Sequence, residues 1–465
     1  MTDRSTNRRR RSIRTISLAS SAVALITLVT LGIMLRQVSN REPSLRTDYV
    51  AIYNADTLSL APTDRAFPIY QQAYAILDSL PSSTSPEYDE AIDERRRAFD
   101  FMLEASTKEQ MGIELPTDPD TPPSLLQAEN AYDDDLVHHR AMEVFNERTE
   151  AIFKNGDTEA YLDALLARIR IGRHFAEVPW PLGDGFLDGL TIASAVDIMK
   201  LAVALPDAVT SDRIAEFDRL FRHAVEHEVG LDTTILRLWF LDVVQWSFDG
   251  NGRFAPRGVV ALCGDGSLAQ DPPLDLCFSA LFSTDRDTVV DVGLATLDHL
   301  ETRCKTPFFA WNGPDQSPAE RFLNPNRLIV DSSQTVLLTV MTDPDSSHLI
   351  AQQRAQILDA TLLTLAAVRH RQSTGAWPAS LDDIDEALLP EVPLDRFDGQ
   401  PLRYRRTDAG PLIYSVGMDG DDDNGRPARN AMDWKPNEER DEALERWPER
   451  YDGDWVLFPP QDDND

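Results

Sequence analysis

The sequence has few cysteines and none of the motifs that mark the common enzyme classes. Its 465 residues include only Cys263, Cys277 and Cys304, too few for a disulfide scaffold. In an oxidising compartment Cys263 and Cys277 could pair across the Gly/Pro/Asp-rich loop between them, and three free, buried thiols are the equal alternative. No phosphate loop, dinucleotide fingerprint or Ser/His/Asp order stands in a strand–helix context. The sequence therefore favours a non-enzymatic protein.

Positive charge is also scarce. The chain has 45 Lys and Arg against 78 Asp and Glu, a formal net charge of −33, and six of its arginines fall within residues 1–14. So acidic a remainder excludes nucleic acid and anionic lipid surfaces as its partners. It suits solubility, high salt or divalent cations, and the 42% of hydrophobic residues is enough for a folded core.

Long hydrophobic runs are limited to one near the N-terminus. Residues 15–35 contain no charged side chain, and as a helix they would reach about 30 Å, the thickness of a hydrocarbon core. The basic residues 1–14 would remain cytoplasmic, and a cleaved signal peptide would have a shorter apolar run with a cleavage site. We therefore predict a single-pass anchor in the cytoplasmic membrane, a linker over 36–46, and a periplasmic exterior.

The first part of the exterior, residues 47–345, has the periodicity of amphipathic helices. Capping signals at 157–159, 211–212 and 283–285 precede runs with apolar residues three and four apart. Residues 186–205 are apolar nearly all round but contain charged side chains, which favours a central buried helix over a second membrane span. No fixed-period repeat is present, so we expect an irregular helical array.

After Pro344 the pattern changes to a small α+β unit. One helix is expected over 346–372, and residues 402–405 and 412–416 read as the strands of a β-hairpin around the turn at 408–410. The acidic residues 437–465 are expected to form a tail laid on the surface.

Four segments in this region carry a resemblance to a known family. They are LLTLAAVRHRQSTGAWPASLDDI (362–384), PLDRFDGQPLRYR (393–405), IYSVGMDGDDDNG (413–425) and NAMDW (430–434). In this order they resemble the globular part of type II secretion major pseudopilins, in which a helix ends in Gly-x-Tyr/Trp-Pro and Tyr-Ser-x-Gly-x-Asp-Gly opens a calcium-binding loop. The resemblance implies a pseudopilin-like α+β domain over 346–436, with calcium held by Asp419, Asp433 and backbone carbonyls around Val416. The chain departs from the family in having Arg396 after Asp395 where the family has Pro, in its extra carboxylates, and in lacking a prepilin-type processing site.

The residues of this loop also suggest a cation without reference to any family. Asp419, Asp421 and Asp423 alternate in a glycine-containing stretch that also holds Asp422 and Asn424. Calcium takes six to eight oxygen ligands, and carboxylates this close would otherwise repel one another. An EF-hand is excluded because Asn424 stands where that loop needs glycine. The alternative is a solvated acidic turn without an ion.

A second candidate metal site is the segment His223-Ala224-Val225-Glu226-His227. It matches the H-x-x-E-H zinc-peptidase pattern, in which two histidines one helical turn apart hold the metal and the glutamate is the base. A third ligand would be needed, and Glu301 is available downstream. The alternative is a solvated pair of histidines on a charged helix.

Together these observations predict a non-enzymatic, membrane-anchored envelope protein with a calcium-stabilised pseudopilin-like end. Its partners would be the membrane and other envelope proteins. The alternatives are a membrane-tethered zinc metallohydrolase using His223, Glu226 and His227, and an accessory component of a type II secretion or pilus-like assembly.

Overall fold

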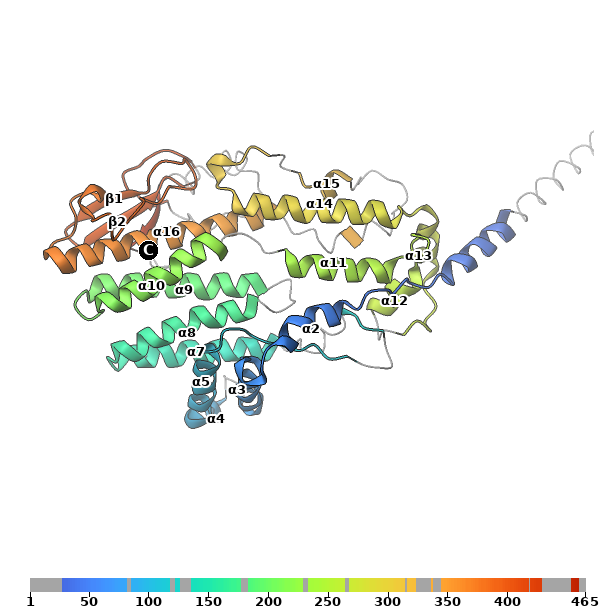
Figure 1. Cartoon of the computed structure of the whole chain (residues 1–465), viewed down its shortest axis with the longest axis horizontal. Coiled ribbons are helices and arrows are strands. Elements are labelled where there is room, and N and C mark those ends of the chain that lie inside the picture. Colours follow the sequence, from blue (N-terminus) through green and yellow to red (C-terminus); the bar gives the residue numbers. More distant parts are fainter. Residues whose placement is uncertain are drawn as a thin grey trace, which may run out of the picture.

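The protein is elongated and mainly helical, with a small sheet at one end (Figure 1). This computed structural model describes residues 27–81, 85–117, 122–125, 135–176, 183–228, 233–263, 267–313, 316–322, 336–337, 344–417, 419–428 and 453–459. The predicted combination of a helical array and a small α+β element is confirmed for this part of the chain.

The helices follow one another along the chain with short connections. They are α2 (Tyr49–Ser59), α3 (Phe67–Ser79), α4 (Pro86–Glu90), α5 (Ile92–Ser106), α7 (Asp135–Lys154), α8 (Thr158–Ala176), α9 (Gly183–Ala204), α10 (Ser211–His223), α11 (Thr234–Ser247), α12 (Pro256–Cys263), α13 (Leu274–Ser279), α14 (Arg286–Lys305), α15 (Pro318–Phe322) and α16 (Pro344–Thr374). Short 3₁₀ turns η1 (Pro62–Asp64), η3 (Ala280–Phe282), η4 (Phe308–Ala310) and η6 (Leu381–Asp383), and the π-helical turn η2 (Ala224–Glu228), lie between them. The predicted caps form at α8, where Asp157 accepts from the nitrogen of Ala160, and at α14, where Asp285 accepts from that of Thr288.

The core consists of three main hydrophobic clusters in sequence along the molecule. The N-terminal cluster joins α3, α5, α7 and α8 and includes Tyr70, Phe99 and Phe145. The central cluster joins α8, α9, α10, α16 and the sheet, and the α11–α15 cluster includes Phe240, Trp246 and Phe254. The central cluster contains residues from both sides of position 345, so the expected domain boundary coincides with the start of α16 but not with a break in the core.

Helix α9 is the central buried helix expected from its composition. Ala195, Ile198 and Met199 are buried between α8 and α16. Asp197, one of its charged residues, pairs with Arg168 of α8 at 2.5 Å. An apolar helix with its charge neutralised in this way packs on both sides.

The sheet has three antiparallel strands in the order β1 (Arg403–Thr407), β2 (Gly410–Ser415) and β3 (Trp455–Phe458). The first two form the predicted hairpin, with Thr407 opposite Gly410. The third corrects the expectation of a surface tail, because β3 is buried and pairs with β2. Trp455 and Phe458 join the central cluster with α16, and their apolar area outweighs the acidic character of the residues around them.

No helix in the described part of the chain is both long and apolar enough to cross a membrane. Of the span expected over 15–35, residues up to 26 lie outside the described residues. The rest belongs to a helix over 27–39, which extends away from the body at the end where α13 lies (Figure 1). Leu28 is 65% exposed and Ile33 55%, while Val38 is buried in the α11–α15 cluster.

All three cysteines are free. Cys277 and Cys304 are buried, as in one of the two alternatives, whereas Cys263 at the end of α12 is exposed. The expected pairing of Cys263 with Cys277 is therefore not present in this structure.

Candidate functional site: an acidic loop beside the sheet

The strongest candidate site is the segment after β2, residues 416–425, named here the acidic loop. It folds back over the sheet, and Gly425 marks the point of closest approach. This glycine has φ of +79°, and a Cβ there would lie 2.7 Å from the Cδ2 of Leu412. Only glycine allows this backbone conformation and contact without strain.

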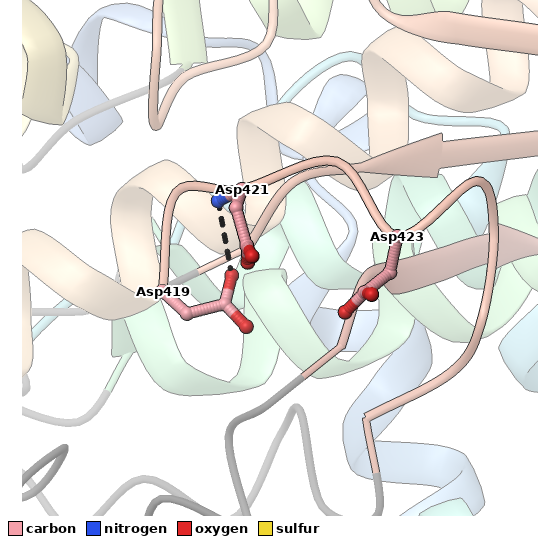
Figure 2. Close-up of side chains that lie close together, drawn as sticks. All are labelled: Asp419, Asp421 and Asp423. Atoms are coloured by element: carbon pink, nitrogen blue, oxygen red, sulfur yellow. Dashed lines mark hydrogen bonds between the residues drawn. The ribbon is translucent and has the colours of Figure 1, made fainter.

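Three carboxylates of the loop converge on one space. Ligand oxygens of Asp419, Asp421 and Asp423 all lie within 4.8 Å of one another. Figure 2 shows the carboxylates of Asp419 and Asp423 approaching from opposite sides, with Asp421 above them. The spacing of two along the loop, noted in the sequence, is thus the spacing that brings these side chains together.

Asp419 is the most constrained of the three. One of its carboxylate oxygens accepts a hydrogen bond from the backbone nitrogen of Gly453 at 2.8 Å, and the other accepts from the nitrogen of Asp421 at 3.4 Å. Burial, with a smaller contribution from the Asp421 charge, raises the pKa of Asp419 to about 6, although both backbone hydrogen bonds oppose the shift. A carboxylate in this position is ready to share its charge with a cation.

The structure adds Asp454, which the sequence analysis missed. Its buried carboxylate accepts from the backbone nitrogens of Gly425 at 2.6 Å and Asp423 at 3.3 Å. Its own backbone nitrogen donates to the carbonyl of Arg426 at 2.8 Å. Burial raises the pKa of Asp454, and the nearby Asp422 and Asp423 add to the effect. The signal in the sequence was the Gly-Asp pair directly before the apolar run of β3.

Asp395 holds the base of the loop. It is buried, and its two oxygens accept from the hydroxyl of Ser415 at 2.8 Å and the backbone nitrogen of Val416 at 2.8 Å. Arg403 pairs with it at 3.0 Å. Val416 is therefore fixed through its nitrogen, at the position where the resemblance expects a carbonyl ligand.

Arg396, which replaces the proline of the family pattern, has its own role. Its guanidinium pairs with Asp359 of α16 at 2.8 Å, and its backbone nitrogen donates to Gln356 of α16 at 2.7 Å. Burial raises the pKa of Asp359, and the Arg396 charge opposes this. The departure from the pattern therefore attaches the turn before β1 to the long helix.

The geometry fits a calcium ion. With calcium–oxygen distances of about 2.3–2.6 Å, ligands on opposite sides of the ion lie about 5 Å apart, which is close to the observed limit of 4.8 Å. Asp419, Asp421 and Asp423 could supply three of the six to eight oxygens that calcium takes. Asp433, the fourth expected side-chain ligand, lies outside the described residues.

The second candidate site is less complete. Helix α10 ends at His223, and the chain continues as the π-helical turn η2, so His223 and His227 are no longer separated by one α-helical turn. His223 and Glu226 are exposed, and the side chain of His227 lies outside the described residues. Glu301 is engaged by Arg237 at 3.4 Å and Lys305 at 2.7 Å. Among the described side chains, the only group of three with metal-binding spacing is that of the acidic loop.

Comparisons with protein families, with curated proteins and with solved structures give no match to this chain. The resemblance to major pseudopilins therefore rests on the quoted motifs, and a function has to be argued from the acidic loop and the exposed helix.

Proposed function

We propose that this protein is a non-enzymatic, membrane-anchored protein of the cell envelope whose C-terminal sheet is stabilised by calcium bound in the acidic loop. The observation that carries the calcium part is the convergence of Asp419, Asp421 and Asp423. The exposed apolar residues of the 27–39 helix support the anchor, because such side chains are stable where lipid surrounds them.

The ion would act as a structural fastener. Asp419 already holds the nitrogen of Gly453, and Asp454 holds that of Gly425. A cation on Asp419 would neutralise the carboxylates that crowd the loop, so that these bonds no longer work against charge repulsion. Calcium binding would in this way stabilise β3 on the sheet, and with it the central cluster to which Trp455 belongs.

Calcium titration of the full-length chain in detergent tests this proposal. The variant Asp419→Ala should lose one binding site. The matched control is Asp408→Ala, which removes the same charge from the exposed turn of the hairpin. Equal binding by the two variants, or no binding below millimolar calcium by the wild-type chain, would contradict the cation proposal.

The resemblance to pseudopilins also gives an alternative, that the C-terminal sheet contacts components of a secretion or pilus-like assembly. Crosslinking in intact cells tests it, and recovery of no such component would count against it.

A further inference from the structure

A second exposed apolar surface lies at the end of the body that the 27–39 helix leaves. Leu274, Phe278 and Phe282 are 75%, 41% and 53% exposed. They are four residues apart on the continuous helical stretch formed by α13 and η3, and residues at this spacing share one side of a helix. The rings of Phe278 and Phe282 are in edge contact, with centroids 5.7 Å apart. We refer to these three side chains as the α13 patch.

The opposite side of the same stretch is part of the core. Cys277 and Ala280 are buried in the α11–α15 cluster. The α13 patch is therefore held on a packed element, and its exposure does not arise from a loose loop.

The 27–39 helix ends on this same cluster. Leu35 packs against the cluster and Val38 is buried in it. Arg41, just beyond the helix, donates to the backbone carbonyl of Phe254 at 3.1 Å. Figure 1 shows α13 beside the point where the helix meets the body. The body is thus attached directly at the base of the helix, without a free linker between them.

We infer that the α13 patch inserts into the lipid surface beside the anchor, an inference that rests on the proposed membrane anchoring. If residues 15–35 span the bilayer, Val38 lies three residues beyond its edge, which is about 5 Å along a helix. Apolar side chains of interfacial helices are buried about 5–10 Å into the headgroup and acyl boundary. The base of the helix therefore brings α13 to the depth at which Leu274, Phe278 and Phe282 leave water.

Charge around the patch indicates which lipids it meets. Asp275 is exposed next to Leu274, and Asp271 is exposed one turn before it. These carboxylates oppose binding to anionic headgroups, so insertion would depend on apolar burial and would suit a zwitterionic surface.

The experiment uses the full-length chain with Cys263→Ser, which removes the exposed thiol. Leu274→Cys and Phe282→Cys are each labelled with an environment-sensitive fluorophore. The control is Leu205→Cys, at a residue 47% exposed in the α9–α10 connection. Each protein is reconstituted into phosphatidylcholine vesicles with and without brominated acyl chains.

Labels at 274 and 282 should be quenched several-fold more strongly by brominated lipid than the label at 205, and be protected from aqueous iodide. Protein that floats with the vesicles while all three labels remain equally open to iodide would overturn the α13 inference and leave the anchor intact. Protein that does not float would overturn both. Protection from iodide in detergent micelles, without quenching by brominated lipid, would assign the patch to a second copy of the chain and overturn the lipid inference.

Discussion

The substitution Asp419→Asn should have opposite effects on stability in chelator and in calcium. Without a cation, the pKa of Asp419 is raised to about 6 in the folded protein from its ordinary value of 3.8. A carboxyl with a raised folded pKa contributes stability below its unfolded pKa and loses that contribution as pH rises through the folded value. Between about pH 4 and 6 the wild-type chain in chelator should therefore become less stable than it would be with a neutral side chain at 419.

The magnitude follows from the same pair of values. Their difference corresponds to at most about 3 kcal/mol, and solvent screening of this partly exposed loop reduces it to about 1 kcal/mol. Asparagine at 419 can still accept a hydrogen bond from Gly453, so at pH 7 in chelator Asp419→Asn should be more stable than wild type by about 1 kcal/mol. Calcium at a hundred times its dissociation constant would stabilise the wild-type chain alone by about 2.7 kcal/mol, which reverses the order.

Urea unfolding of both proteins in detergent, from pH 4.5 to 7 with chelator or with millimolar calcium, measures this crossover. Asp408→Asn in the exposed hairpin turn controls for the loss of one charge from an acidic chain. If Asp419→Asn is the less stable protein in chelator at pH 7, the reasoning about carboxylate crowding is wrong. If calcium stabilises all three proteins equally, the ion binds elsewhere.

Three further predictions concern the surroundings of the loop and the thiols. Gly453→Ala should cost about 3 kcal/mol in urea unfolding, because φ is +131° and a Cβ would lie 2.7 Å from a backbone nitrogen; Gly156→Ala, with open space and φ of +77°, should cost about 1 kcal/mol. Asp395→Ala should cost about 3 kcal/mol, since it leaves buried donors without an acceptor, whereas Asp408→Ala should stay within about 0.5 kcal/mol, and equal losses would contradict the assigned role. Native protein should expose one reactive thiol, Cys263, and unfolded protein in non-reducing buffer three; a single thiol after unfolding would show a disulfide.

Local signals in the sequence were sufficient for the hairpin and for several helix ends. The turn at 408–410 lies between alternating strands only a few residues apart, and Asp157 and Asp285 bond to backbone nitrogens three residues away. Such contacts depend on neighbours in the sequence. The alternation of Asp419, Asp421 and Asp423 belongs to the same class, which is why their convergence could be predicted.

The third strand and Asp454 could not be found in this way. Strand β3 pairs with β2 from a position more than thirty residues further along the chain, and four apolar residues within an acidic stretch have no local feature that specifies a partner. Asp454 acquires its role only after that pairing, because its acceptors face Gly425 once β3 is in place. The role of Arg396 likewise depends on Asp359, which lies on another element.

The position of the acidic loop gives the helical body a role in the proposed function. The sheet and the 27–39 helix lie at opposite ends of the molecule, and α14 and α16 run along the distance between them (Figure 1). Helix α16 alone has 31 residues, about 46 Å at 1.5 Å per residue. It contacts α14 at one end and the sheet at the other, with Leu300 and Cys304 of α14 packed against Ala351 and the sheet packed further along. In the proposed arrangement the body is therefore a rigid spacer that holds the calcium-dependent end away from the membrane, so that a protein binding the sheet would not have to approach the bilayer.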